Sequence, residues 1–369
     1  MENNHLTYFK VENFKKFKSL EVSDIGQFNL IVGDNNVGKT CLLEALLFDE
    51  DANQMISNFY LALTKRGLKF EIKEITTKIG NTETIEKASP KENYFKKNII
   101  KQDSKELRIF AKTDANLEIS ISTFSSTSLA IHNAFANKID FLINRFNEEI
   151  EIKKNINQFV SISLNKQKNN LIWIYNYELD IWNFPLITFN DSSLDKVTID
   201  LYNNLDIEGE DVLLDTLKII NPELFKIGFK NEFEDLKDVF VLSFNGEKKQ
   251  IPLNFLGDGF KRIFYIILKT ISLKGKRIMI DEIEIGIHHS KMKDFWVNIF
   301  KVCKELDVQL FATTHSEECI EAYVEAAKEV NEQNIRLIRL QENKDKSIKA
   351  ICYPYNAFED IAESKTENR

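Results

Sequence analysis

The chain has 369 residues, of which 43% are hydrophobic and 29% are charged, and its formal net charge is −8 at pH 7. This length allows one large domain or two ordinary domains, and the acidic balance means that the whole molecule does not attract nucleic acid, although a local basic face could. The four cysteines form no CxxC pair, no apolar run reaches membrane length and residues 1–10 lack a signal-peptide layout, so we expect a cytoplasmic protein without disulfides, zinc or a membrane partner.

The first elements of the chain are predicted to be a strand, a loop and a helix. Apolar and polar residues alternate over 6–11, and a second apolar run over 28–32 stops at Gly33, which is the pattern of two strands. From residue 39 the leucines follow the spacing of a buried helical face, which predicts a helix over 39–48. The N-terminal part therefore contains a strand–loop–helix unit.

Residues 51–236 differ from both ends of the chain. They are rich in Asn, Lys and Ile, alternate like a strand over 117–121, and contain a long helical candidate across 128–158. No motif that carries chemistry is found among them. We predict that they form a mostly helical, variable lobe inserted into the main domain.

After residue 236 strands and helices alternate again. The patterns predict strands over 239–243, 278–280 and 309–313, and helices over 260–272 and 290–306. Alternation at both ends of a chain implies one α/β fold with a mixed sheet assembled from the two termini. The expected domain organisation is a head made of 1–50 and 237–320, the inserted lobe, and a helix, hairpin and charged tail over 321–369.

Residues 33–40 have the sequence GDNNVGKT, the GxxxxGKT pattern of a phosphate-binding loop. Gly33 and Gly38 allow the backbone to wrap closely enough for its amides to face phosphates, and the following helix adds a favourable dipole. Lys39 is expected to reach the β- and γ-phosphates, and the Thr40 hydroxyl to bind Mg²⁺. The alternative is a glycine turn with an accidental lysine, and the position between strand and helix argues against it.

A second group of candidate residues follows two later strands. Asp281 and Glu282 end an apolar strand, where Asp281 can hold Mg²⁺, usually through water, and Glu282 can orient the attacking water. His315 ends the next strand, from which an imidazole can reach the γ-phosphate. Solvated strand-end acids and a lone histidine are the alternatives. The phosphate loop earlier in the chain favours the functional interpretation.

The order of these motifs resembles the ABC-type ATPase family, in its soluble branch with the SMC proteins, the overcoming-lysogenization-defect nucleases and the standalone ATPases of bacterial anti-phage systems. The similarity covers about residues 5–50 and 237–320. It is carried by the N-terminal entry Val11–Phe17, the run Phe28–Leu46, Leu256–Arg262 at the position of the ABC signature, Asp281–Ser290 as Walker B and D-loop, and Thr313–Ser316 as H-loop.

This resemblance implies an ABC-type P-loop ATPase head that binds ATP and Mg²⁺ and closes as a homodimer or higher homo-oligomer, with nucleotide between the Walker A loop of one copy and the signature helix of the other. Glu282, His315 and Lys39 would be catalytic, and Thr40 and Asp281 would bind the metal. The nucleotide-binding residues would be Gly33, Asn35, Asn36, Gly38, Lys39, Thr40 and Cys41, with Gly257, Asp258 and Gly259 from the partner copy.

Three points of the resemblance stay open. Gly257 stands where the family usually has a serine, which leaves the strength and speed of closure undecided, and a tight turn before a helix is the alternative to a signature at Leu256–Gly259. A Q-loop glutamine is not placed. Glu284 is either a second acid of the site or an ordinary hydrogen-bonded acid of the D-loop.

The expected function is ATP binding and slow hydrolysis that drives a conformational or assembly switch, in an anti-phage defence system whose effector, a nuclease or toxin, is a separate polypeptide. The insertion is too short for SMC arms, and about fifty residues after His315 leave no room for a nuclease domain. An ABC transporter subunit fits the large insertion less well. A nucleotide-stabilised scaffold with little turnover stays open, as does a DNA-binding repair or recombination ATPase that contacts phosphates through Lys15, Lys16, Lys18, Lys96, Lys97, Lys153 and Lys154, which otherwise are solvated lysines.

Overall fold

The computed structural model of the protein describes residues 4–49, 52–66, 74–79, 82–87, 106–125, 158–164, 167–171, 183–188, 191 and 196–357. The helices in these parts of the chain are α1 (Lys39–Ala45), α2 (Ala52–Lys65), α5 (Lys196–Asn203), α6 (Ile207–Ile220), α7 (Asp258–Ser272), α8 (His289–Glu305) and α9 (Glu317–Glu329), with a 3-10 turn η1 (Leu253–Phe255). The strands are β1 (Leu6–Phe14), β2 (Phe17–Ser23), β3 (Phe28–Gly33), β4 (Glu74–Ile79), β5 (Thr82–Lys87), β6 (Glu106–Thr113), β7 (Glu118–Ser125), β8 (Gln158–Leu164), β9 (Gln167–Leu171), β10 (Leu186–Ile187), β11 (Leu224–Phe233), β12 (Leu236–Phe244), β13 (Ile251–Pro252), β14 (Arg277–Ile280), β15 (Gln309–Thr313), β16 (Ile335–Glu342) and β17 (Ile348–Pro354).

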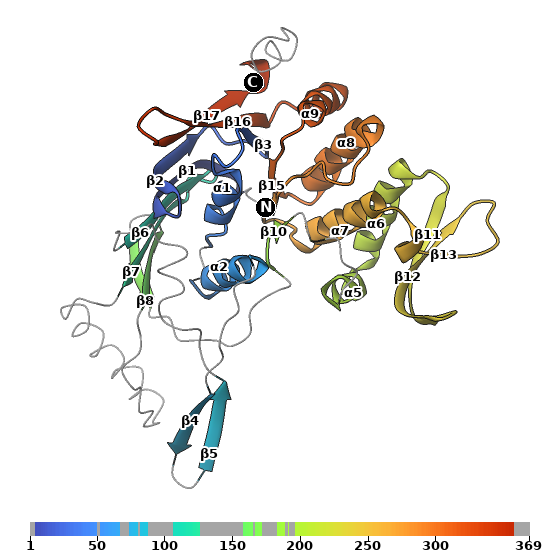
Figure 1. The fold of residues 1–369 in the computed structure, drawn as a ribbon, viewed down its shortest axis with the longest axis horizontal. Coiled ribbons are helices and arrows are strands. Elements are labelled where there is room, and N and C mark those ends of the chain that lie inside the picture. Colours follow the sequence, from blue (N-terminus) through green and yellow to red (C-terminus); the bar gives the residue numbers. More distant parts are fainter. Residues whose placement is uncertain are drawn as a thin grey trace.

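A six-stranded sheet lies between the helices and positions the candidate motifs (Figure 1). Its strand order is β10-β14-β15-β3-β16-β17, and all neighbouring strands are parallel except β16 and β17. The carboxyl ends of parallel strands lie at one edge of a sheet, where ligands of such folds bind. The loop after β3, the two acids after β14 and the histidine after β15 therefore meet at the same edge.

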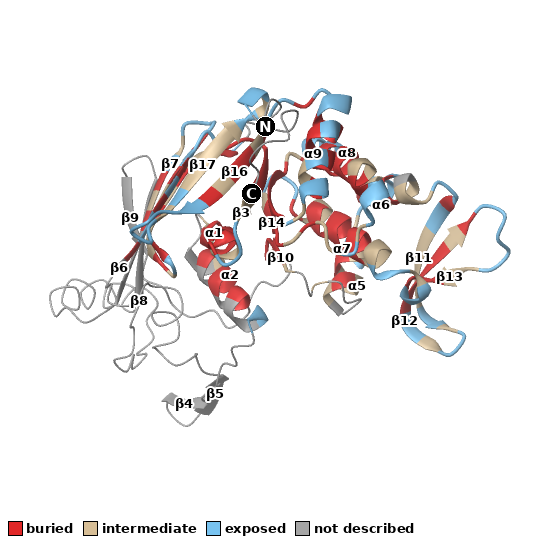
Figure 2. Ribbon diagram, turned by 45° about the horizontal axis from the view of Figure 1, so that its top comes forward, coloured by how far each residue is buried: buried red, intermediate tan, exposed pale blue. Residues whose placement is uncertain are grey.

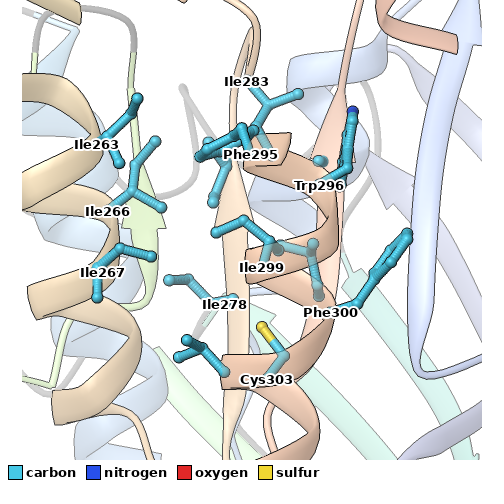
Figure 3. Close-up of a cluster of buried hydrophobic side chains, with 14 of the residues drawn as sticks. Ile263, Ile266, Ile267, Ile278, Ile283, Phe295, Trp296, Ile299, Phe300 and Cys303 are labelled. Atoms are coloured by element: carbon cyan, nitrogen blue, oxygen red, sulfur yellow. The ribbon is translucent and has the colours of Figure 1, made fainter. Parts of the chain in front are cut away.

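Different elements cover the two faces of this sheet, because successive side chains of a strand point to opposite faces. Ile278 and Ile280 of β14 belong to the core formed with α7, α8 and α9, whereas Met279 between them belongs to the core formed with α1, β1 and β2. Figure 3 shows Ile267 of α7 and Ile299 of α8 converging on β14 in the first core. Each buried side chain of this size contributes roughly 1.5–3 kcal/mol relative to an exposed one.

The predicted insertion contributes to both large sheets. A second six-stranded sheet has the order β2-β1-β6-β7-β8-β9, so strands from the middle of the chain extend the N-terminal hairpin, and β10 pairs with β14 in the central sheet. The prediction of a mostly helical lobe is wrong for the described part of 51–236, which carries more strands than helices. The helical candidate over 128–158 lies outside the described residues, except for Gln158.

The C-terminal elements are joined to the central sheet, because β16 pairs with β3. Helix α9 follows the H-loop region, and β16 and β17 form an antiparallel hairpin at the edge of the central sheet, while the charged tail beyond residue 357 lies outside the described residues. A separate three-stranded sheet, β11-β12-β13, lies beside α6 (Figure 1). Figure 2 shows that buried residues concentrate in the central sheet and its flanking helices. Among the described residues, no helix has the length and apolarity to cross a membrane.

Candidate active site

The loop between β3 and α1 has the backbone path of an anion cradle. Its φ angles are 142° at Gly33, 63° at Asn36 and 119° at Gly38, all in the region that L-residues rarely adopt. A Cβ atom at Gly33 would lie 2.4 Å from the carbonyl oxygen of Leu340, so only glycine fits there. Backbone turns of this kind direct successive amides at a bound anion. The local geometry therefore agrees with the predicted phosphate loop.

The side chain of Lys39 lies within this loop and is only 6% exposed. Its Nζ donates to the carbonyl oxygens of Gly33 at 2.6 Å and Asp34 at 3.2 Å, and lies 3.3 Å from Nδ1 of His315. Burial lowers the pKa of Lys39, and the nearby carboxylates, led by that of Asp281, oppose the shift. A cation is thus held at the centre of the cradle.

Thr40 and Asp281 bring two kinds of oxygen ligand together beside the loop. The Thr40 hydroxyl donates to Oδ2 of Asp281 at 3.0 Å, and the Thr313 hydroxyl donates to Oδ1 at 2.7 Å. Mg²⁺ prefers oxygen ligands and is usually held by one or two carboxylates, with water and phosphate oxygens filling its octahedron. A hydroxyl and a carboxylate at this distance fit such an ion.

Glu282 is half-buried at the edge of the sheet and has a φ of 50°. A left-handed conformation costs a residue with a Cβ atom free energy, and it persists only where neighbours hold it. The amide of Glu282 donates to the Thr313 hydroxyl at 2.8 Å, and Arg262 donates to the carbonyl oxygen of Asp281 at 3.0 Å. These contacts hold the backbone of Asp281 and Glu282 in this conformation.

Arg262 is a supporting residue that the sequence interpretation missed. Its guanidinium is buried, with the residue 2% exposed, and it joins α7 to the end of β14 and to the carbonyl oxygen of Thr188 at 2.7 Å. Burial lowers the pKa of Arg262, and the carboxylates around it, beginning with Asp191, oppose the shift. The signal in the sequence was an arginine one turn into an otherwise apolar helix, where a buried cation needs partners.

His315 is the last of the predicted catalytic residues and is exposed at the end of β15. Its imidazole lies beside Lys39, as given above, and its amide donates to Oε1 of Glu284 at 2.9 Å. The structure thus brings Lys39 beside His315 and Thr40 beside Asp281 at the same edge of the sheet.

The remaining loop residues differ in what they contact. Asn35 is exposed, and Asn36 accepts a hydrogen bond from Nζ of Lys16 through Oδ1 at 2.9 Å. Cys41 is half-buried, and burial raises the pKa of its thiol, which disfavours the reactive thiolate. Cys41 therefore has a packing position behind the loop.

The signature residues lie apart from the phosphate loop of their own chain. Gly257 caps the N-terminus of α7, and Asp258 is 87% exposed while pairing with Lys261 at 2.6 Å. Within the described ranges no hydrogen bond or ion pair joins 257–259 to residues 33–40. One chain alone does not complete the predicted nucleotide site.

Gly259 links the signature helix to the D-loop through direct backbone contact. A Cβ atom at Gly259 would lie 1.9 Å from the carbonyl oxygen of Gly286, whereas one at Gly257 would meet nothing within 4 Å. The backbone at the start of α7 therefore packs directly against the turn after Glu282, with no room for a side chain between them.

We expect Gly259→Ala to lower the free energy of unfolding by about 2 kcal/mol or more, because the added methyl group must displace backbone. Gly257→Ala, two residues away in open space, is the matched control and should keep the wild-type urea midpoint. Equal midpoints for the two variants would show that the contact between α7 and the D-loop is not tight.

A buried ion cluster anchors α1 one turn beyond Thr40. Glu44 is 2% exposed and pairs with Lys15 at 2.6 Å and with Nη2 of Arg66 at 2.9 Å. Burial lowers the pKa of Lys15, and the Glu44 charge opposes that shift. Of the lysines considered as DNA-phosphate contacts, Lys15 is therefore bound to Glu44 within the protein, and Lys18 is exposed. Lys96, Lys97, Lys153 and Lys154 lie outside the described residues.

Glu44→Ala is expected to lower the free energy of unfolding by about 3 kcal/mol, because it leaves the buried Lys15 cation without its partner. Arg66 is half-exposed, so its guanidinium can be solvated by water in the variant. We therefore place the loss of unfolding free energy at the lower end of the range for breaking a buried ion pair. Chemical denaturation measures it. Glu118→Ala removes an exposed pair with Lys112 at 2.9 Å and should leave the midpoint unchanged; a Glu44 variant equally stable would contradict the expectation.

Comparison with known proteins shows the family to which this chain belongs. A family model described as "AAA domain, putative AbiEii toxin, Type IV TA system" matches residues 28–321. An ATP/GTP phosphatase of Helicobacter pylori is 26% identical over 365 residues, which cover 87% of this chain and 88% of that protein. An uncharacterised protein of Methanocaldococcus jannaschii is 31% identical over 110 residues, which cover 30% of this chain and 92% of that protein.

Solved structures show the same fold. The Smc head bound to the C-winged helix domain of ScpA has a TM-score of 0.52 at 11% identity, covering 95% of this chain and 99% of that chain. The Smc head with an extended coiled coil, bound to the C-terminal domain of ScpA derived from Pyrococcus furiosus, has a TM-score of 0.53 at 11% identity, covering 98% and 100%. The fold is that of an α/β P-loop ATPase head of the ABC/SMC type.

Proposed function

This chain belongs to the AAA-domain family described as putative AbiEii toxin of a type IV toxin–antitoxin system, and from its ATPase fold and site we propose that it works as a nucleotide-driven switch. The protein is an ATPase of the ABC/SMC-like P-loop class. The observation that supports the assignment of its site is the arrangement at the sheet edge, where Lys39 lies beside His315 and Thr40 beside Asp281, although the members of each pair are distant in sequence.

In the proposed reaction each residue has a separate task. Lys39 exchanges its contacts with the loop carbonyls for the β- and γ-phosphate oxygens, and Glu282 orients the attacking water in line with the bond that breaks. Thr40 and Asp281 would hold Mg²⁺, and His315 would contact the γ-phosphate. When bound, the metal ion neutralises charge on the phosphate oxygens. Glu282 is suited to its task because Thr313 and Arg262 hold its backbone.

The site is proposed to be completed by a second copy of the chain. Asp258 at the start of α7 faces solvent, and Gly257 has open space beside it, so the amides 257–259 are free to meet the γ-phosphate of a partner. Gly257 supplies no hydroxyl there, and we propose slow closure as the consequence. Closure on the signature helix would be transmitted to the D-loop of the same chain through the contact between Gly259 and Gly286.

The biological role is proposed to be regulation of a separately encoded effector in a bacterial anti-phage or toxin–antitoxin-type system. The family description supports this role. The two SMC heads are complexes with ScpA domains, and by analogy a second protein would dock on this ATPase.

Phage challenge of bacteria that carry the chain with its neighbouring genes tests this role. Protection that requires both the wild-type chain and the neighbour, and that Lys39→Ala removes, supports it. Protection that Lys39→Ala leaves intact, or none at all, would contradict the nucleotide-driven defence role.

A further inference from the structure

The turn after Glu282 carries a third acid, Glu284, whose place in the site the sequence left open. The amide of Ile287 donates to the Glu284 carbonyl oxygen at 3.0 Å, and the amide of Ile285 donates to that of Glu282 at 3.2 Å. These bonds make a compact turn that leads from the end of β14 to α8. The turn thus fixes the Glu284 backbone relative to the candidate base Glu282.

The side chain of Glu284 connects this turn to the H-loop. Oε1 accepts the hydrogen bond from the amide of His315 at 2.9 Å, across a separation of 31 residues. The same histidine presents Nδ1 to Lys39 at 3.3 Å. A carboxylate contact on the backbone of His315 therefore sets where its imidazole stands relative to the phosphate loop.

The second carboxylate oxygen of Glu284 has an unusual environment. Oε2 is buried and makes no hydrogen bond among the described residues. A buried acceptor without a donor costs free energy. The cation of Lys39 offsets the negative charge of Glu284: burial lowers the pKa of Lys39, and the charges of Asp281, Asp34, Glu282 and Glu284 raise it. A residue used only to close the turn would not need a charge in this position.

We propose that Glu284 is a positioning residue for hydrolysis: it clamps the H-loop to the D-loop turn through the His315 amide and so holds the imidazole against the γ-phosphate side of the cradle. The proposal rests on the role assigned to His315 above. It explains why an acid occupies this half-buried place, since a carboxylate both accepts the amide bond and complements Lys39. Glu282 lies two residues earlier in the same turn, so the contact with the His315 amide also connects the turn that carries the candidate base to the H-loop.

The test is a double-mutant cycle on ATP turnover with Glu284→Ala, His315→Ala and the double variant. We expect Glu284→Ala to lower kcat roughly tenfold with little change in KM, as loss of a supporting contact does. In the His315→Ala background the same change should cost almost nothing, because contacts that act through one group are not additive. Glu284→Gln keeps an acceptor for the His315 amide but loses the charge, so it should recover the part of the rate that depends on that hydrogen bond.

Glu317→Ala, an exposed acid two residues beyond His315, is the matched control and should keep the wild-type kcat. Wild-type rates for Glu284→Ala beside a slow His315→Ala, or fully additive losses in the double variant, overturn the positioning role alone. A wild-type rate for His315→Ala overturns the role of His315 and this inference with it. Unfolding midpoints, with Glu284→Gln as the conservative variant, separate a loss of rate from a loss of fold.

Discussion

Glu282→Gln is expected to reduce ATP turnover at least about 100-fold while leaving ATP binding intact, because a positioned base that orients the attacking water contributes roughly 10²–10⁴-fold to such reactions. The amide is nearly isosteric with the carboxylate, and the hydrogen bond between the Glu282 amide and Thr313 stays. The backbone of the site is therefore preserved, and only the base is lost. Phosphate release under saturating ATP and Mg²⁺ measures the effect.

The same assay on Glu317→Gln provides the control, since that side chain is exposed at the start of α9. Turnover near the wild-type rate in Glu282→Gln would mean that another group activates the water. If the variant and the wild type both bind ATP and neither turns it over, the protein is a nucleotide-stabilised scaffold.

Lys39→Ala is expected to weaken ATP binding about 100-fold or more, because it removes the cation that the loop holds where the β- and γ-phosphates are placed. When ATP binds, Lys39 loses its hydrogen bonds to the carbonyl oxygens of Gly33 and Asp34, which the structure shows in the chain without nucleotide. Calorimetric titration with ATP measures the affinity directly. The effect differs in kind from that of Glu282→Gln, which spares binding.

Lys18→Ala is the control for this variant, because Lys18 is exposed on β2. ATP affinity unchanged in Lys39→Ala would place the nucleotide elsewhere in the protein. An unfolding midpoint for each variant distinguishes loss of a ligand contact from collapse of the loop, since Lys39 also ties the loop to itself.

The local patterns of the sequence predicted the strand–loop–helix unit and the later strands well, because these segments follow one period and end at distinct residues. β15 spans Gln309–Thr313 as predicted, and α7 begins at Asp258, two residues before the predicted start. The strand β2 was missed: Lys15, with a φ of 45°, reverses the chain between β1 and β2, and a lysine gives no turn signal.

The insertion was predicted less well, because its order depends on distant partners. β6 pairs with β1 across about a hundred residues of sequence, and β10 is a two-residue strand that exists only beside β14. Neither relation leaves a periodic signal. The mostly helical prediction followed from the long helical candidate over 128–158, a local pattern that does not record strand pairing.

The same limit applies to the supporting residues of the site. Lys39 and Asp281 belong to motifs with fixed spacing, whereas Glu44, Arg262 and Thr313 act through contacts made by folding. The close approach of Gly259 and Gly286 likewise depends on how α7 meets the D-loop. The roles of these residues depend on contacts that form only in the folded protein, so the sequence pattern could not predict them.

The particle mass of Glu282→Gln, measured by light scattering with and without ATP and Mg²⁺, tests most directly the claim that nucleotide closes two copies around the signature residues. The mass should double, or rise further to a higher oligomer, only when ATP is bound, and the double variant with Lys39→Ala should stay at the mass of the unliganded chain. An unchanged mass in a variant that retains ATP would contradict an ATP-driven assembly.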